Sequence, residues 1–308
     1  LTRIAKNAHR FIEVVKTKMR PFLLTPEDID AYLESGHWSS ETMVDRYDAY
    51  ALEFHNVVAC CDQTESYSWA QLRAVTDRLA TNLIDLGLAR DATALVQISS
   101  SCREFILRIG LKKAGIIGAF VPMQWRRQEL EYTSLRVKPS LVVMDRVLMD
   151  SREATSLDSI FEKLPILPLQ IDLADEPSNG WLRWADVLKP TKNGNALTML
   201  AKRRFKFDEV SLITVSSGTS GAAKLCEWPE GAQMCKSRVL GERMGLTPDD
   251  HVGIFAPMSG AAGLVVWMIS ASTPFLCTFP SSFKAADLLN LVHKYKITVA
   301  TTVPVILA

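Results

Sequence analysis

The feature that most constrains the fold of this chain is a repeated alternation of short apolar runs with helical segments. Apolar runs of strand length occupy 92–98, 116–122 and 140–144, and between them apolar residues recur every three or four positions. Strands that alternate with helices predict βαβ units, in which a mainly parallel sheet is covered by helices. The alternation restarts at 209–215 and continues almost to residue 308. We therefore expect an α/β fold with two βα lobes.

The chain length and one turn-rich stretch suggest where these lobes divide. A chain of 308 residues exceeds the size at which a single core usually stops growing. The stretch "KPTKNGN" at 189–195 places turn residues between the two alternating regions. We predict a helical appendage at 1–40, a first α/β lobe at 41–200 and a second α/β lobe at 201–308.

Two helix starts can be predicted to the residue. Thr25 stands directly ahead of Pro26, which is the order of an N-cap and a first helical position. Ser68 and Gln71 have the spacing of a capping box at the start of an amphipathic run, and Gly87 follows that run where a left-handed cap belongs. We therefore expect helices that begin after Thr25 and after Ser68.

The composition excludes several classes of function. With 35 Lys and Arg against 34 Asp and Glu, the net charge of +1 gives no field that would collect nucleic acid. The six cysteines have no metal-ligand spacing, which favours reduced thiols, and Cys60 and Cys61 are expected to be buried. No apolar run has the roughly 18 residues needed to span a bilayer. These patterns favour a cytoplasmic protein.

The stretch "SSGTSGAAK" at 216–224 carries the clearest chemistry in the chain. Gly218 and Gly221 permit backbone conformations and close approaches that a Cβ would block, and Lys224 adds a mobile positive charge. The hydroxyl groups are those of Ser216, Ser217, Thr219 and Ser220. Backbone amides, hydroxyls and an ammonium group are suited to binding the oxygens of a polyphosphate.

The stretch taken alone has a plainer interpretation, since turns rich in Ser and Gly are more often simple surface loops. It is not a Walker A loop, because Lys224 lies three residues after Gly221 and is followed by Leu225. The chain also has no G-x-G-x-x-G motif of the dinucleotide-binding type. The phosphate hypothesis therefore depends on what surrounds the loop.

The loop and its flanking segments resemble one family. "SSGTSGAAK" is similar to the phosphate-binding signature of adenylate-forming enzymes, which include acyl-CoA synthetases, aryl-acid AMP ligases, luciferases and nonribosomal peptide adenylation domains. "YSWAQL" at 67–72, the segment 95–123 and the segment 244–258 resemble further parts of the same family in the same order. The resemblance covers about residues 25 to 308. The segment 28–47 is most similar to aryl-acid AMP ligases and to CoA ligases for aromatic, alicyclic or medium-chain acids.

The resemblance implies an activity and a set of ligands. Enzymes of this family activate a carboxylate with ATP and Mg²⁺, release pyrophosphate, and pass the acyl group of the acyl-adenylate to a thiol such as CoA. It assigns Ser216, Ser217, Gly218, Thr219, Ser220, Gly221 and Lys224 to the β- and γ-phosphates of ATP. It places the acyl group beside Met258, Ser259, Gly260, Ala261 and Ala262.

The sequence departs from the family pattern at both places. Ala223 stands where the family usually has Pro, and Leu225 stands where it usually has Gly. Small residues at 259–262 replace the His or aromatic residue that commonly lies beside the acyl group. A pocket widened for a bulky acid and simple packing at a helix start are both open interpretations of this segment.

The family's later elements have no counterpart before Ala308. These elements are a Tyr-Gly-x-Thr-Glu motif whose Glu helps to hold Mg²⁺, an Asp that binds the ribose, and a lid domain with a catalytic Lys. We therefore interpret the chain as a truncated large domain without its C-terminal lid, which contains no metal ligand and is inactive or weakly active by itself. A non-catalytic nucleotide- or acyl-binding relative and an unrelated α/β NTPase are the alternatives.

Overall fold

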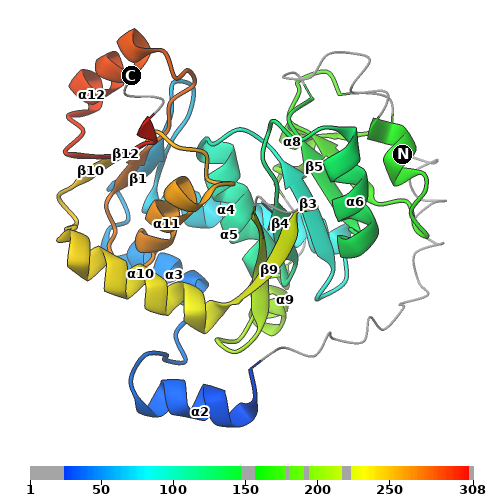
Figure 1. Ribbon diagram of the computed structural model, residues 1–308, viewed down its shortest axis with the longest axis horizontal. Helices are drawn as coiled ribbons and strands as arrows, with labels where there is room; N and C mark the ends of the chain where they lie inside the picture. The colour runs from blue at the N-terminus through cyan, green and yellow to red at the C-terminus, as the bar shows by residue number, and fades with distance from the viewer. Residues whose placement is uncertain (1–23, 147–156, 178–179, 191–193, 217–222, 305–308) are drawn as a thin grey trace.

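The computed structural model describes residues 24–146, 157–177, 180–190, 194–216 and 223–304. Two sheets dominate these residues (Figure 1). The seven-stranded sheet has the order β7-β6-β5-β3-β4-β8-β9, and the five-stranded sheet has the order β12-β10-β11-β1-β2. All neighbouring strands are parallel except the pairs β8–β9 and β1–β2, which are antiparallel. The predicted α/β fold with mainly parallel sheets is confirmed.

The strands of the seven-stranded sheet are β3 Thr93–Gln97, β4 Ile117–Phe120, β5 Leu141–Met144, β6 Leu169–Asp172, β7 Leu182–Arg183, β8 Val210–Ser216 and β9 Lys224–Pro229. Those of the five-stranded sheet are β1 Val58–Cys61, β2 Ser66–Ser68, β10 His251–Ile254, β11 Leu276–Thr278 and β12 Val299–Thr301. The helices are α2 Pro26–Glu34, α3 Met43–Glu53, α4 Trp69–Asp85, α5 Cys102–Ala114, α6 Arg127–Val137, α8 Trp184–Val187, α9 Ala196–Arg203, α10 Glu230–Met244, α11 Ala261–Ile269 and α12 Ala285–Tyr295.

The predicted helix caps are present. The Thr25 hydroxyl accepts a hydrogen bond from the backbone N–H of Asp28 at 3.2 Å, and the Ser68 hydroxyl accepts one from Gln71 at 3.3 Å. Both caps are complete capping boxes, in which the third helical residue bonds back to the cap. Gly87 has a φ of +91°, as a left-handed cap requires. The helix starts predicted after Thr25 and Ser68 are confirmed.

Each sheet takes strands from both halves of the chain. The hairpin β1–β2 precedes residue 70, yet β1 pairs with β11 in the five-stranded sheet. The hairpin β8–β9 follows residue 200, yet β8 pairs with β4 in the seven-stranded sheet. Within the described residues, sheet membership therefore does not change at residue 200. The division into units at 1–40, 41–200 and 201–308 stays a prediction.

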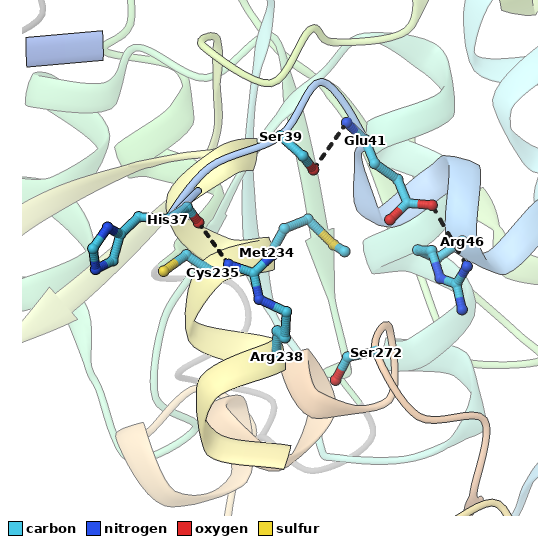
Figure 2. Close-up of a pocket in the computed structure, with 8 residues that line it drawn as sticks. All are labelled: His37, Ser39, Glu41, Arg46, Met234, Cys235, Arg238 and Ser272. Atoms are coloured by element: carbon cyan, nitrogen blue, oxygen red, sulfur yellow. Dashed lines mark hydrogen bonds and ion pairs between the residues drawn. The ribbon is translucent and has the colours of Figure 1, made fainter. Parts of the chain in front are cut away.

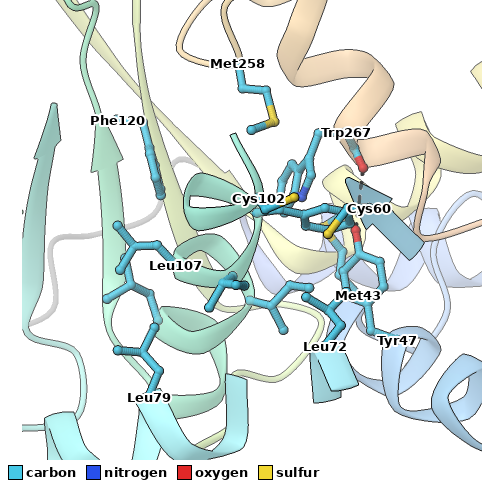
Figure 3. Close-up of a cluster of buried hydrophobic side chains, with 14 of the residues drawn as sticks. Met43, Tyr47, Cys60, Leu72, Leu79, Cys102, Leu107, Phe120, Met258 and Trp267 are labelled. Atoms are coloured by element: carbon cyan, nitrogen blue, oxygen red, sulfur yellow. Dashed lines mark hydrogen bonds between the residues drawn. The ribbon is translucent and has the colours of Figure 1, made fainter. Parts of the chain in front are cut away.

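Helices α4 and α5 lie between the two sheets and carry much of the main core (Figure 1). Figure 3 shows this cluster, to which α4 contributes Leu72, α5 contributes Leu107 and α11 contributes Trp267. Cys60 and Cys61 are buried, as expected, and all six cysteines are free thiols. Such a core fixes the two sheets to one central helical layer, so α5 can contact segments that follow strands of both sheets.

None of the described helices combines the length and apolar character needed to cross a bilayer.

Candidate active site

The loop singled out in the sequence connects two antiparallel strands. Strand β8 ends at Ser216, strand β9 begins at Lys224, and these two residues are register partners. Directly opposite residues of an antiparallel pair project from the same face with their Cβ atoms about 5 Å apart. The Ser216 hydroxyl and the Lys224 side chain therefore start from neighbouring positions, and both residues are exposed. Ser217, Gly218, Thr219, Ser220 and Gly221 lie outside the described residues.

The hairpin distinguishes this loop from a helix-type phosphate loop. In a Walker or Rossmann site the loop leads into a helix whose N-terminus faces the phosphate. Here the chain continues as strand β9, and helix α10 begins only at Glu230. Lys224 is therefore the first residue of a strand, and it is separated from the N-terminus of α10 by the length of β9. The strand β9 was not predicted from the sequence.

A buried polar cluster closes the base of the hairpin. Lys112 of α5 donates to the Glu230 carboxylate, to the Ser211 hydroxyl at 2.7 Å and to the Gln233 side-chain oxygen at 2.9 Å. Glu230 also accepts from Ser211 and from the backbone N–H of Met43, the latter at 3.1 Å. Burial lowers the pKa of Lys112, while the carboxylate of Glu230 opposes that shift. Strand β8 and the first turn of α10, which directly follows β9, are thus fixed to α5 at the end opposite the loop.

The segment assigned to the acyl group lies between β10 and α11. Met258 is fully buried, Ser259 and Ala262 are half-buried, and Gly260 and Ala261 are exposed. Gly260 is the N-cap of α11, so the small residues do stand at a helix start. The wide pocket and the packing at a helix start both stay hypotheses for residues 259–262.

Both backbone groups of Met258 bond to side chains that follow β3 in the chain. The Met258 N–H donates to the Ser100 hydroxyl at 2.7 Å, and the Met258 carbonyl accepts from Nη2 of Arg108 at 2.9 Å. Sequence reasoning missed Ser100 and Arg108, as it missed Lys112 and Glu230. A usable signal was present in α5, because Arg108 and Lys112 stand in a helix whose other positions are largely apolar.

A pocket of about 200 Å³ lies elsewhere, between α10 and the chain around α3 (Figure 2). Its lining includes Glu41, Arg46 and Arg238, but none of the residues predicted from the sequence as site residues. Arg238 is bonded to the backbone carbonyls of Gly36 and His37 at 2.8 and 3.1 Å. Arg46 contacts Glu41 at 3.5 Å. Because both guanidinium groups have protein partners, we assign this pocket no role in the candidate active site.

The described residues contain no group of three or more His, Cys, Asp or Glu side chains placed to hold a metal ion.

Comparison with known proteins identifies the family. The sequence profile of the family "AMP-binding enzyme" matches residues 47–308. The enterobactin synthase component E of Escherichia coli is 28% identical over 127 residues, which are 41% of this chain and 23% of that protein.

Solved structures agree on the fold. The apo structure of Mycobacterium smegmatis MbtA has a TM-score of 0.77 at 19% identity, over 91% of this chain and 51% of that one. The anthranilate CoA ligase AuaEII in complex with anthranoyl-AMP has a TM-score of 0.74 at 18% identity, over 85% of this chain and 49% of that one. The match thus covers about half or less of each of these three proteins. Because the family profile covers most of its length, the chain belongs to the AMP-binding, adenylate-forming enzymes.

Proposed function

We propose that the enzyme of which this chain forms part activates a carboxylic acid with ATP. A carboxylate oxygen attacks the α-phosphorus of ATP, the bond from that phosphorus to the pyrophosphate oxygen breaks, and an acyl-adenylate forms. The main support is the family profile over 47–308, which includes the loop flanked by Ser216 and Lys224. The bound anthranoyl-AMP in AuaEII is an acyl-adenylate held by a protein of the same fold.

The residues of the hairpin loop are proposed to hold the β- and γ-phosphates. The hydroxyl of Ser216 donates to phosphate oxygens, and the Lys224 ammonium adds a positive charge next to it. Donors that face the departing pyrophosphate stabilise the charge that develops on it in the transition state. Ser217, Gly218, Thr219, Ser220 and Gly221 complete this proposed set. Mg²⁺ would add further positive charge to the phosphates when bound.

We propose an aromatic, alicyclic or medium-chain acid as the substrate and CoA as the acceptor of the acyl group. An aromatic, alicyclic or medium-chain acid fits the resemblance of segment 28–47, and a thioester with CoA fits the class of ligase to which AuaEII belongs. The acyl group is placed beside Met258, Ser259, Gly260, Ala261 and Ala262. Small side chains at the last four positions favour a bulky acid.

Pyrophosphate exchange into ATP tests this proposal on the full-length protein. A panel of aromatic, alicyclic, short-chain and medium-chain acids should show acid-dependent exchange, with the bulkier acids preferred. A preference confined to the smallest acids would contradict the wide pocket. Binding of ATP without exchange for any acid would instead indicate a non-catalytic relative.

The role of the hairpin loop needs a separate measurement. Calorimetry should show weaker binding of ATP or pyrophosphate to Lys224→Ala than to the wild type. Lys284→Ala is a matched control, since Lys284 is also an exposed lysine but lies at the start of α12. Unchanged ATP affinity in Lys224→Ala would remove this loop from the proposed mechanism.

A further inference from the structure

The two side chains that bond to Met258 are themselves joined through a third. The Ser100 hydroxyl donates to Oε2 of Glu104 at 3.0 Å. Oε1 of Glu104 accepts from Nε and Nη2 of Arg108 at 3.0 and 2.6 Å. With the two Met258 contacts, Ser100, Glu104, Arg108 and Met258 form a closed ring of hydrogen bonds, which we call the Met258 ring.

The Met258 ring connects the ends of strands from different sheets. Ser100 follows β3 of the seven-stranded sheet, and Met258 follows β10 of the five-stranded sheet. Both segments leave their strands at the carboxyl ends. Each of these strands is parallel to its main neighbours in the sheet. Ligand sites of α/β folds form outside such carboxyl ends. The ring therefore holds together two segments at the edge where a substrate would bind.

The ion pair of the ring is buried in apolar surroundings. The side chains of Arg108 and Glu104 are 1% and 2% exposed. The Arg108 guanidinium lies 3.7 Å from the centroid of the Phe120 ring and 5.0 Å from that of Trp267. Figure 3 shows Met258 near both aromatic side chains. Nη1 of Arg108 is also buried and has no hydrogen-bond partner within the described residues.

The buried ion pair of Arg108 and Glu104 contributes more to the geometry of the Met258 backbone than to the stability of the fold. Removing two charges from water costs several kcal/mol each, and well-packed apolar residues in place of a buried pair are often equally stable. An unpaired buried donor such as Nη1 adds a further cost. The ring does, however, fix the N–H and the carbonyl of the same residue. Rotation about the backbone bonds of Met258 would break one contact or the other.

We propose that Ser100, Glu104 and Arg108 are positioning residues that fix the backbone of Met258, the first residue of the segment Met258–Ala262, and thereby influence which acids the enzyme accepts. This inference rests on the proposed function, in which that segment lies beside the acyl group. The three side chains act through Met258 and need not touch the substrate. ATP binding at the hairpin loop should not depend on them.

Ser100→Ala is the sharpest test, because it removes the anchor of the Met258 N–H and leaves the Arg108–Glu104 ion pair in place. Ser101→Ala is the matched control. Within the described residues, the Ser101 hydroxyl donates inside its own loop, to the Ser99 carbonyl at 3.3 Å, and makes no capping bond to α5. Both variants of the full-length protein would be compared with the wild type in pyrophosphate exchange over the acid panel.

In Ser100→Ala we expect KM for the preferred acid to rise about three- to tenfold, the change that one lost hydrogen bond produces. KM for ATP should stay within about twofold, and the ranking of acids should flatten. Ser101→Ala should match the wild type. A parallel rise of both KM values would overturn the inference, because it would indicate a general loss of structure. Equal behaviour of the two serine variants would overturn it as well.

Amide hydrogen exchange tests the anchor without relying on activity. Peptides that cover residues 256–262 should exchange faster in Ser100→Ala than in the wild type and in Ser101→Ala. Unchanged exchange in these peptides would overturn the inference. Absence of pyrophosphate exchange in the wild type would instead contradict the proposed function, and the amide measurement separates these two failures.

Arg108→Lys and Arg108→Met extend the test to the other side of the ring. Lys keeps the positive charge but offers one nitrogen where Arg108 uses two, Nε and Nη2, to bond Glu104 and the Met258 carbonyl. We expect acid selectivity to be lost in both variants, and Arg108→Lys to retain more stability than Arg108→Met. Wild-type acid selectivity in a folded Arg108→Lys protein would overturn the role of the guanidinium group.

Discussion

The hairpin loop and the segment Met258–Ala262 are held in the structure in contrasting ways. The buried polar contacts of the hairpin lie at its base, where Lys112 bonds to groups on β8 and α10. Strand β8 also pairs with β4, whereas Ser216 and Lys224 at the loop ends of the strands are exposed. The Met258 segment is fixed at its own backbone by Arg108 and Ser100. One anchor of each segment, Lys112 for the hairpin and Arg108 for the Met258 segment, lies on α5, and these two residues are one turn apart.

The difference fits the ligands that we propose for the two segments. A polyphosphate is flexible and highly charged, so a hairpin with a firm base and exposed Ser216 and Lys224 can adapt to it. An acyl group is recognised by shape, and shape requires a backbone that stays in place. We expect changes at the hairpin base to alter stability, changes at its tip to alter ATP binding, and changes at the Met258 ring to alter acid recognition.

The largest effect is expected at the hairpin base. Glu230→Ala removes the carboxylate that pairs with Lys112 and that also accepts from Ser211 and the Met43 N–H. A buried ammonium group then loses its counter-charge, which should lower the free energy of unfolding by about 3–5 kcal/mol in urea denaturation. Glu242→Ala on the same helix is the control, because Glu242 is exposed. A loss below about 1 kcal/mol for Glu230→Ala would show that the cluster is not the main anchor of the hairpin.

The next largest loss of stability is expected at Gly263, which directly follows the segment Met258–Ala262. A Cβ on Gly263 would lie 2.4 Å from the carbonyl oxygen of Ala256 and 2.6 Å from that of Pro257, both of which are backbone atoms. Gly263→Ala should therefore lower the free energy of unfolding by about 1–3 kcal/mol. The comparison is Gly260→Ala, whose Cβ would lie 3.4 Å from its nearest atom. Its expected cost is smaller, about 1 kcal/mol, since Ala is a poorer N-cap than Gly but meets no close backbone atom here. Equal losses would contradict the tight packing at 263.

These anchors also show where sequence reasoning succeeded and where it stopped. Helices with a complete local signal, such as the capping box of Ser68 and Gln71, could be predicted, because the determining contacts lie within one turn. Strand β9 could not, since Lys224–Pro229 mixes exposed polar and half-buried residues and owes its conformation to pairing with β8. The pairing of β1 with β11 depends on residues more than 200 positions apart in the chain.

The same limit applies to the candidate site. The residue types of the loop indicated phosphate chemistry, because glycines, hydroxyls and a lysine carry that information locally. The anchors carried a weaker signal, because charged residues in a largely apolar helix indicate buried partners but do not identify them. Only the packing of α5 between two sheets buries them. Family resemblance supplied the order of the segments but did not indicate what holds them.

A smaller loss of stability is expected when Asp48 is changed. Asp48 pairs with Lys113, a third charged residue of α5, which anchors neither the hairpin nor the Met258 segment. The Lys113 ammonium bonds to Asp48 of α3 at 2.9 Å and to Asp77 of α4 at 2.6 Å. Partial burial would raise the pKa of Asp48, but Lys113 and Arg204 lower it more, so the pKa lies below its ordinary value. Asp48→Asn should lower the free energy of unfolding by about 1–2 kcal/mol at pH 7.

The sign of the pH dependence follows from that lowered pKa. The stabilisation by Asp48 is fully present above the unfolded-state pKa of about 3.9 and is lost as the pH falls through the folded-state pKa. Urea denaturation should therefore show the difference between the wild type and Asp48→Asn shrinking below about pH 4. The KM values for acid and for ATP should not change. A pH-independent difference would contradict the ionic contribution of Asp48.

The smallest effect on stability is expected at the hairpin tip. Lys224 is exposed at the first position of β9, so Lys224→Ala should change the free energy of unfolding by less than about 0.5 kcal/mol. The same variant should bind ATP more weakly, and Lys224→Arg should restore part of that affinity because it keeps the charge. Lys284→Ala should change neither quantity. A loss of stability as large as that in Glu230→Ala would mean that the tip is a structural part of the hairpin, and the contrast between a firm base and a free tip would then be wrong.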